Sequence, residues 1–466
     1  MSLLSSIDAA LAAFVTFVWG TPLLILLVGG GLFLLITSRA RPYRYLQHSI
    51  DLLRGKYDNP DDPGQVSHSQ ALSTALSGTL GLGNIAGVAI AISTGGPGAI
   101  FWMWVTAIVA VATKFYTASL SIMYRGYDSN GELQGGPMYV IREGLSKKWR
   151  PLASLFAIAA LLGLLPSFQS NQTVQLLRTA FAEPWGWANE DNSFLFDLSL
   201  GLVLAVAAGV VIAGRIQRIA KFAEKIVPAM VVFYLALTFI VIAYFWQQVP
   251  AAFMSIISDA FSGEAIAGGA LGTVIATGIS RGAFSNEAGI GTESLAHGAA
   301  KTREPIREGL VATLGPIVDT LIVCTCTALV ILVTGVWQEA DGIKGVSLTA
   351  NAFSNVFGES LGPILLLIMV LPLAFSTMVT FWYYGTKCFA FLFGHKWLKF
   401  YSLSYIILII VGAVASLDII NNLIIGMYAI MAIPTMVSTL LLHKKVNYSA
   451  SQYFEHNQKK FTGKVN

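Results

Sequence analysis

Ser77-Gly78-Thr79-Leu80-Gly81-Leu82-Gly83-Asn84-Ile85-Ala86-Gly87 is a glycine-rich stretch in the middle of a hydrophobic segment. Each glycine costs about 1 kcal/mol relative to alanine inside a helix, so the stretch predicts a break between two half-helices. Within a membrane, unwound backbone survives only where it is buried in protein or lines a cavity. There its free N–H and C=O groups can hold a small zwitterion and a cation. The alternative is close helix packing, which small residues also permit.

The composition is that of a membrane protein. Hydrophobic residues make up 55% of the chain and charged residues 12%, whereas soluble proteins carry roughly 25% charged residues. Cys324, Cys326 and Cys388 lie in or beside apolar segments and define neither a disulfide framework nor a metal site. The first basic residue is Arg39, and the first apolar run is too long for a signal peptide, so none is expected.

Eleven apolar runs are long enough to cross about 30 Å of hydrocarbon. They lie near 14–37, 71–94, 98–123, 151–166, 195–213, 226–246, 265–290, 309–334, 361–385, 401–417 and 421–442. We therefore expect an all-α polytopic membrane protein with eleven transmembrane helices, two of them discontinuous, and no soluble domain.

The basic residues predict the orientation. Most of the 29 Lys and Arg residues follow the first, third, fifth, seventh and ninth segments or lie in the C-terminal tail. The positive-inside rule makes these loops cytoplasmic, with the N-terminus outside and the C-terminus in the cytoplasm. The basic excess reports topology, so no nucleic-acid partner is expected. Lys114 lies inside the third segment and is expected to snorkel to the cytoplasmic interface.

A second interrupted stretch reads Thr277-Gly278-Ile279-Ser280-Arg281-Gly282-Ala283-Phe284-Ser285-Asn286-Glu287-Ala288-Gly289-Ile290-Gly291. It begins five segments after the first, and this odd offset reverses its direction in the membrane. Two discontinuous helices in inverted halves point to a secondary transporter's binding site. The expected parts are an extra N-terminal helix and loop over 1–66, inverted five-helix repeats over 67–255 and 256–445, and a tail over 446–466.

The first break supplies the expected binding groups. The second half-helix begins near Gly83 and Asn84, where free N–H groups and a positive dipole suit a carboxylate. The carbonyls of residues 77–80 suit sodium or a substrate ammonium group. Gly81 lets a ligand touch the backbone, and Thr79 and Asn84 add side-chain oxygens. The alternative for Asn84 is an interhelical hydrogen bond.

Polar residues in other segments are further candidates. Gln169 follows the break at Pro166 and can reach substrate from there, or cap the segment at the interface. Asp319 lies about ten residues into the eighth segment, and a carboxylate at such depth is a functional candidate by default. It could neutralise a cation, relay a proton or pair structurally with Arg281.

Several motifs resemble the alanine or glycine:cation symporter family. They are Gly78–Gly87, Gly95–Trp104, Gly135–Tyr139, Arg281–Gly289 and Tyr383–Gly385, and the likeness runs from the first helix to about residue 440. The resemblance implies the leucine-transporter fold, with a 5+5 inverted repeat, and sodium-coupled uptake of a small neutral amino acid. The chain departs from the family at Leu82, Thr117 and Phe381, where Thr, Glu and Trp are usual.

The resemblance also implies a sodium site formed by Ser77, Leu80, Leu373, Ser376 and Thr377. Judged from the residues alone, the adjacent hydroxyls of Ser376 and Thr377 could instead bond to their own helix.

We expect an apolar wall opposite the first break to select substrates by size. Phe381 lies one turn beyond Thr377 on the same helix face, and Ile275 and Ile279 come from the second interrupted segment. The expected substrate-binding set is Thr79, Gly81, Gly83, Asn84, Gln169, Ile275, Ile279, Thr377 and Phe381.

Other functional classes fit less well. A channel would need a continuous polar pathway or repeated filter residues, and an embedded enzyme would need a nucleophile, a metal cluster or paired carboxylates. We therefore expect a secondary active transporter of the cell membrane and not an enzyme, and the resemblance implies a symporter whose ligands are sodium and alanine or glycine. The alternative is a transporter of the same fold that couples to protons or takes a larger neutral amino acid.

Overall fold

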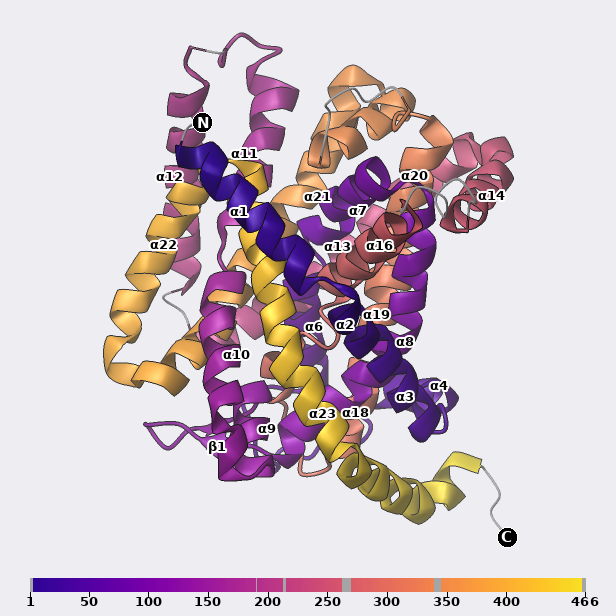
Figure 1. Cartoon of the computed structure of the whole chain (residues 1–466), viewed down its shortest axis with the longest axis vertical. Helices are drawn as coiled ribbons and strands as arrows, with labels where there is room; N and C mark the ends of the chain where they lie inside the picture. Colours follow the sequence, from indigo (N-terminus) through magenta and orange to yellow (C-terminus); the bar gives the residue numbers. More distant parts are fainter. Residues whose placement is uncertain (1–2, 190, 213–214, 262–269, 339–344, 463–466) are drawn as a thin grey trace.

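The computed structural model describes residues 3–189, 191–212, 215–261, 270–338 and 345–462. Its helices form one bundle, with the N-terminus and the C-terminus towards opposite ends (Figure 1). One small antiparallel hairpin, β1 (Gly126–Tyr127) and β2 (Leu133–Gln134), lies at the end near the C-terminus. Helix α4 (Arg41–Arg44) lies at this same end, which we call the basic end.

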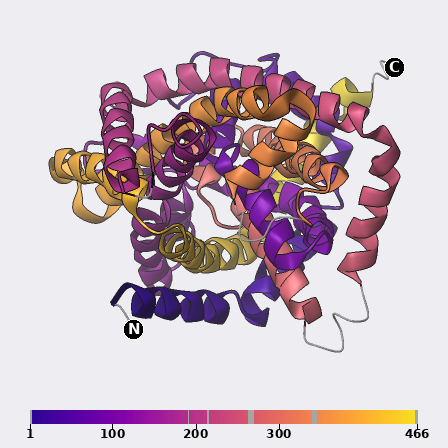
Figure 2. The same ribbon diagram turned by 90° about the horizontal axis from the view of Figure 1, so that it is seen from above.

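The N-terminal helices run along the outer edge of the bundle (Figure 2). They are α1 (Leu3–Val18), α2 (Thr21–Leu24), η1 (Ile25–Gly29), α3 (Gly30–Thr37), α4 and α5 (Leu46–Leu53). The expected first repeat contains α6 (His68–Thr79), α7 (Leu82–Gly95), α8 (Gly98–Met123), the hairpin, α9 (Pro137–Gly144), η2 (Lys147–Trp149), α10 (Arg150–Gly163), α11 (Ser167–Leu177), η3 (Arg178–Ala182), α12 (Ser193–Ile212), α13 (Arg215–Tyr244) and η4 (Trp246–Gln248).

The remaining elements follow after residue 248. They are α14 (Val249–Ala260), α16 (Ala270–Asn286), α17 (Glu293–His297), α18 (Pro305–Ala312), α19 (Leu314–Pro316), η5 (Ile317–Cys324), α20 (Thr325–Thr334), α21 (Val346–Phe393), η6 (His395–Trp397), α22 (Leu398–Val414) and α23 (Leu417–Thr462). Helix α21 is kinked at Gly358, whose φ of 82° is not helical.

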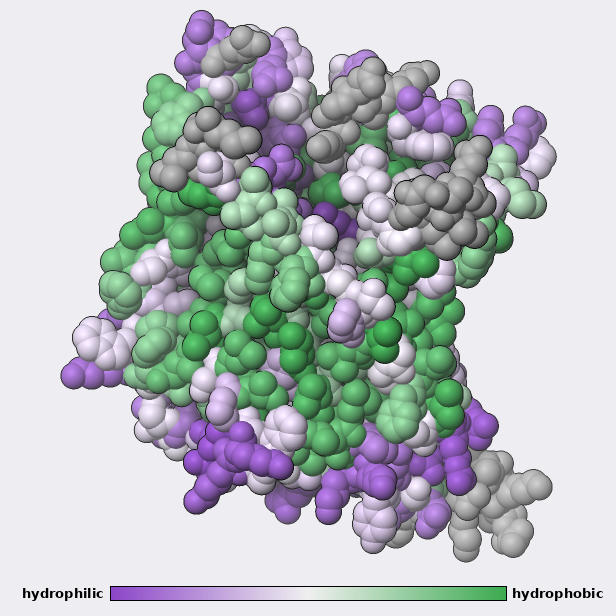
Figure 3. Space-filling model, viewed as in Figure 1, coloured by the Kyte–Doolittle hydropathy of each residue, from purple (hydrophilic) through white to green (hydrophobic). Residues whose placement is uncertain are grey.

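The hydrophobic surface matches a membrane-spanning bundle. Apolar side chains cover the middle of the face in Figure 3, and hydrophilic ones gather towards its ends. Among the described residues nine helices are long and apolar enough to span a membrane, or ten if the pair Ser6–Val18 and Thr21–Thr37, bent by 50°, counts as one span. The seventh predicted run, 265–290, lies partly outside the described residues, so the count of eleven stays a prediction.

The second interrupted stretch is helical further than expected. Helix α16 continues to Asn286, and the break covers only residues 287–292. A Cβ on Gly278 would lie 2.5 Å from the Ala99 carbonyl oxygen, and one on Gly282 would lie 3.0 Å from Cβ of Thr106. These two glycines therefore serve close packing of α16 against α8, which is the alternative use of small residues in membranes.

Candidate functional site

The first broken helix opens at Leu80 and Gly81, as predicted. Leu80 has ψ of 84° and Gly81 has φ and ψ of −144° and −151°, so neither residue continues the helix. The Gly81 N–H donates to Oδ1 of Asn84 at 3.3 Å. This bond occupies the side-chain oxygen of Asn84 at the start of α7. The break leaves backbone N–H and C=O groups of both half-helices without helical hydrogen-bond partners.

The five predicted sodium ligands come together where α21 crosses the end of α6. Oγ1 of Thr377 lies 2.9 Å from the Ser77 carbonyl oxygen and 3.0 Å from the Leu373 carbonyl oxygen. Ser376 Oγ donates to the same Leu373 oxygen at 2.9 Å. Leu80 and Leu373 line one small cavity. Carbonyl and hydroxyl oxygens at an unwound helix segment are the donors that suit sodium in secondary transporters.

Gln169 and Thr79 provide buried polar oxygens. Oε1 of Gln169 is buried and has no hydrogen-bond partner within the described part of the chain. Oγ1 of Thr79 and Oδ2 of Asp319 also lack one, although the two side chains interact electrostatically. A buried polar atom without a partner costs free energy, so these oxygens are suited to a polar ligand.

The side chain of Asp319 joins three elements. It is fully buried in the π-helical segment η5, where Oδ1 accepts hydrogen bonds from Asn84 Nδ2 and, at 2.6 Å, from Ser285 Oγ. The interhelical bond considered for Asn84 is therefore present. The pairing considered between Asp319 and Arg281 is not seen among the described residues: Arg281 donates instead to Asn421 at 3.1 Å.

Phe284 covers the first break with its ring, a role that was not predicted from the sequence. A Cβ on Gly83 would lie 3.2 Å from Cε1 of Phe284. The ring packs edge-on against Phe168 at 5.7 Å between centroids and lies 5.4 Å from Tyr428. Aromatic contacts of this kind fix a ring's position. Phe284 is a large residue among small ones in the second glycine-rich stretch, and this contrast could have indicated its role.

The residues predicted as the apolar wall lie on the expected helices. Ile279 of α16 is 4% exposed and Ile275 is half-buried. Phe381 of α21 is 3% exposed, and its ring lies 6.3 Å from that of Tyr384. Tyr384 faces α6, because a Cβ on Gly78 would lie 3.3 Å from its ring. Phe284 approaches Gly83 closely. That Ile275, Ile279 and Phe381 form the apolar wall of the pocket stays a prediction.

Buried charges surround the second break. Glu287, at φ 55°, accepts hydrogen bonds from Tyr428 at 2.9 Å and from Thr292. The expectation that Lys114 snorkels is wrong: Lys114 is 1% exposed, and a Cβ on Gly315 would lie 3.1 Å from its Nζ. Its charge acts on Glu287 and Asp319. Carboxylates inside the bundle compensate the ammonium group, so it need not reach water.

A cavity of about 650 Å³ opens at the end of the molecule opposite the basic end. Its lining includes Gln175 of α11, Phe181 of η3, and Ser354 and Pro363 of α21. Oε1 of Gln172 accepts the N–H of Val346 at 3.3 Å, which holds the start of α21 close to α11. Gln175, which lines the cavity, and Gln169 both belong to α11.

A family model described as the sodium:alanine symporter family matches residues 4–466. The chain belongs to the sodium:alanine symporter family. Its members are transporters, and the long apolar helices of this chain make it a multi-pass membrane transporter. The resemblance of the motifs is thereby confirmed over nearly the whole length.

Curated relatives support the same assignment. The chain is 39% identical over 430 residues to the sodium/alanine symporter AgcS of Methanococcus maripaludis, covering 92% of this chain and 93% of the relative. It is 35% identical over 439 residues to the probable sodium/glutamine symporter GlnT of Bacillus subtilis, covering 93% and 88%. It is 37% identical over 391 residues to a putative sodium/proton-dependent alanine carrier, YrbD, of the same organism, covering 80% and 76%.

Solved structures of other transporters share the helical fold of this chain. MhsT in complex with L-phenylalanine matches with a TM-score of 0.58 at 14% identity, covering 83% of this chain and 98% of MhsT. A manganese transporter from Eremococcus coleocola matches with a TM-score of 0.52 at 13% identity, covering 81% and 78%. At these identities the likeness concerns the fold alone.

Proposed function

We propose that this family member is a sodium-coupled symporter of a small neutral amino acid, working by alternating access in the cell membrane. The observation that carries the proposal is the meeting of the Ser77 and Leu373 carbonyls with the Thr377 hydroxyl at the first break. A cation held there would bind to α6 and α21 together, so its binding would favour one arrangement of the two helices. Two inverted halves, 67–255 and 256–445, would supply these elements.

The amino acid would bind on the other side of the break. The start of α7 offers its free N–H groups to the carboxylate, and the end of α6 offers carbonyls to the ammonium group. Thr79 and Gln169 would add the oxygens that lack partners. The basic end would face the cytoplasm, as the positive-inside rule requires, with the N-terminus outside and the 650 Å³ cavity as the outer vestibule.

The proposed coupling ion and substrate are supported by the oxygen groups at the first break and by the name of one relative, the sodium/alanine symporter AgcS. The close approach of Phe284 to Gly83 narrows the region beside the break, which favours a small substrate such as alanine or glycine. A larger neutral amino acid or proton coupling is the alternative, and the buried carboxylates of Asp319 and Glu287 are the observation in its favour. Counterflow of alanine in proteoliposomes, with and without sodium, separates these candidates.

Alanine or glycine uptake should depend on an inward sodium gradient. We expect uptake in sodium medium to exceed that in choline medium at fixed pH and membrane potential, because the site at the first break must be filled for tight substrate binding. Labelled alanine uptake into proteoliposomes measures this. Equal uptake in the two media would refute sodium coupling, and a response to a proton gradient alone would favour the alternative.

Size selection should depend on the aromatic rings. Phe284→Ala should shift preference towards valine and leucine, because one methylene in an apolar pocket is worth roughly 1–3 kcal/mol, or about 10- to 200-fold in discrimination. Phe381→Ala should act in the same direction with a smaller effect, since Phe284 has the close approach to Gly83. Competition by alanine, serine, valine and leucine against labelled alanine measures the ranking.

The matched control for these variants is Phe393→Ala. Phe393 ends α21 and is 57% exposed, so its loss should leave the ranking unchanged. An unchanged ranking in Phe284→Ala would place that ring outside the binding pocket. An unchanged ranking in Phe381→Ala would show that Phe381 does not line the pocket.

A further inference from the structure

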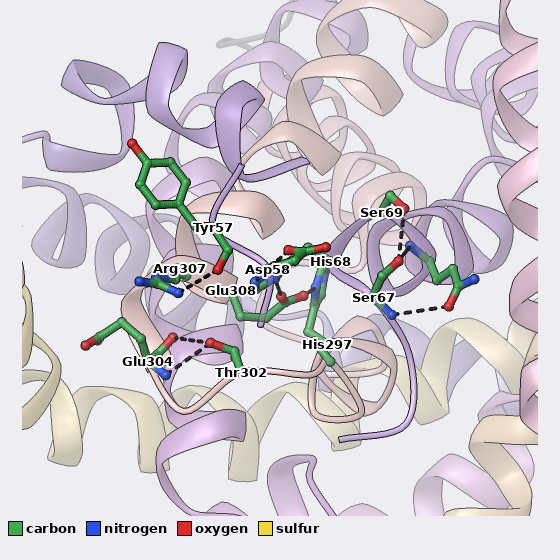
Figure 4. Close-up of polar contacts among 12 residues, drawn as sticks. Tyr57, Asp58, Ser67, His68, Ser69, His297, Thr302, Glu304, Arg307 and Glu308 are labelled. Carbon is green, nitrogen blue, oxygen red and sulfur yellow. Dashed lines mark hydrogen bonds and ion pairs between the residues drawn. The ribbon is translucent and has the colours of Figure 1, made fainter. Parts of the chain in front are cut away.

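A buried cluster at the basic end joins two histidines through one carboxylate. Glu308 lies between His68 and His297, with Oε2 on Nδ1 of His68 and Oε1 2.5 Å from Nδ1 of His297 (Figure 4). All three side chains are 2% exposed or less. We call these three residues the histidine latch. None of them was singled out from the sequence, because they are 240 and 11 positions apart and meet only in the fold.

The histidine latch ties together the basic ends of both broken helices. His68 begins α6, His297 ends α17, and Glu308 comes from α18, which follows α17. The backbone is closed at the same place: the Lys301 N–H donates to the Val66 carbonyl at 2.7 Å, and the Gln65 N–H to the Ala299 carbonyl at 2.8 Å. Separating α6 from α17 at this end therefore requires breaking the latch.

The surroundings distinguish the charge states of the two histidines. Each Nδ1 faces an oxygen of Glu308, so each must carry a hydrogen when that carboxylate is ionised. Nε2 of His297 is buried without a partner among the described residues, so a second proton there would have no acceptor. Nε2 of His68 instead lies 4.0 Å from Oδ1 of Asp58. His68 is therefore the member placed to hold an extra proton, between two carboxylates.

Other charged groups around His68 modify this preference. Arg307 of α18 opposes a positive charge on His68, while its guanidinium donates to the Tyr57 carbonyl at 2.9 Å. Glu224 of α13 accepts hydrogen bonds from the neighbouring residues Ser69 and Gln70. Burial lowers the pKa of Arg125 to about 10, and the charge of Glu308 opposes this effect. The nearest charged partners of His68 remain its two carboxylates.

We propose that His68 is a proton-controlled switch for opening the basic end: protonated, it holds α6 to α17 through Glu308, and deprotonated, it lets them separate. This rests on the alternating access and orientation of the proposed function, which make this end the cytoplasmic gate. The closed arrangement, with Glu308 and Asp58 beside the imidazole, binds the proton more tightly than the open one. Linkage then makes closure strongest at acidic pH and weaker as the pH rises, by at most about tenfold per pH unit for one proton.

Distance measurements between spin labels test the switch without any transport. The chain would carry Cys324→Ala, Cys326→Ala and Cys388→Ala, with labels introduced at exposed Asp61, in the loop before α6, and exposed Lys301, in the loop after α17. The protein in nanodiscs is measured from about pH 5.5 to 8.5 in sodium-free buffer without amino acid. We expect a longer-distance population to grow as the pH rises. Because no sodium or substrate is present, this result stands or falls separately from sodium:alanine symport.

Three variants identify the residue responsible. His68→Gln can still donate to Glu308 but cannot take a proton, so its distances should not change with pH. Asp58→Asn leaves the buried contacts intact, since Asp58 is 41% exposed, and should move the midpoint to lower pH. The control His443→Gln alters a histidine that contacts the Leu440 carbonyl of its own helix, and should respond like wild type.

Wild-type distances that do not change with pH, or a His68→Gln variant that keeps the wild-type response, would overturn the proposal. If His68→Gln does not fold, Asp58→Asn decides in its place, and an unchanged midpoint there would overturn it.

Discussion

Gly81→Ala is expected to abolish most sodium-driven uptake. A Cβ at this position would lie 2.6 Å from Oγ1 of Thr377, which no real Cβ tolerates. The threonine side chain is short and stiff at χ1, so it cannot move aside without leaving the Ser77 carbonyl. Overpacking of this kind costs about 1–3 kcal/mol, which corresponds to roughly a 5- to 150-fold loss in apparent sodium affinity.

The measurement for Gly81→Ala is sodium activation of alanine uptake, alongside the thermal unfolding midpoint of the purified protein. The matched control is Gly272→Ala in α16, where the added methyl group meets no atom within 4 Å. The control should behave as wild type. Wild-type sodium activation in Gly81→Ala would show that the first break tolerates a side chain and does not form the cation site.

Thr377→Ala should weaken sodium activation more than it weakens folding. It removes the hydroxyl that lies between the carbonyls of Ser77 and Leu373. Losing one of about five oxygen ligands should raise the half-saturating sodium concentration by roughly tenfold or more, since 1.4 kcal/mol is a factor of ten. Substrate affinity should fall only when sodium is present, because coupling between the two ligands is reciprocal. Thr377→Ser should restore both.

Thr380→Ala is the control for Thr377→Ala. Thr380 lies on the same helix, is equally buried, and bonds to the Ser77 hydroxyl at 2.9 Å, yet it is outside the predicted ligand set. Both variants lose one interhelical hydrogen bond, so both should lose a similar amount of stability, about 1 kcal/mol. Identical sodium activation in the two variants would show that the Thr377 hydroxyl makes only a structural contact and does not bind sodium.

Predictions from the sequence were most reliable for features that depend on the backbone. The break at Leu80 and Gly81 was predicted because glycine weakens helices wherever it occurs, and the structure confirms it. The second stretch was predicted less well. Its first glycines serve packing against α8, and the break begins only at Glu287. A glycine in sequence does not distinguish an unwound backbone from a close helix contact, because both need the absence of a Cβ.

Side-chain partners were harder to predict. A structural pair of Arg281 and Asp319 was one of the predicted alternatives, yet Arg281 donates to Asn421 and Asp319 accepts from Asn84 and Ser285. Lys114 was expected to reach the interface and instead lies beside Gly315, close to buried carboxylates. The stability of a buried charge depends on groups from other helices, and their positions follow from packing rather than from spacing along one segment.

By itself, then, the sequence determined the membrane character and the first broken helix, because composition and glycine content are local properties of the chain. The residues proposed to bind sodium came from the resemblance of its motifs to a family. Only the tertiary structure decided that Phe284 covers Gly83, that Lys114 is compensated inside the bundle, and that His68 and His297 share Glu308. The physical reason is that each of these features is a contact between helices far apart in sequence. Its strength comes from burial and from the exclusion of water, which no single segment possesses before the bundle is packed.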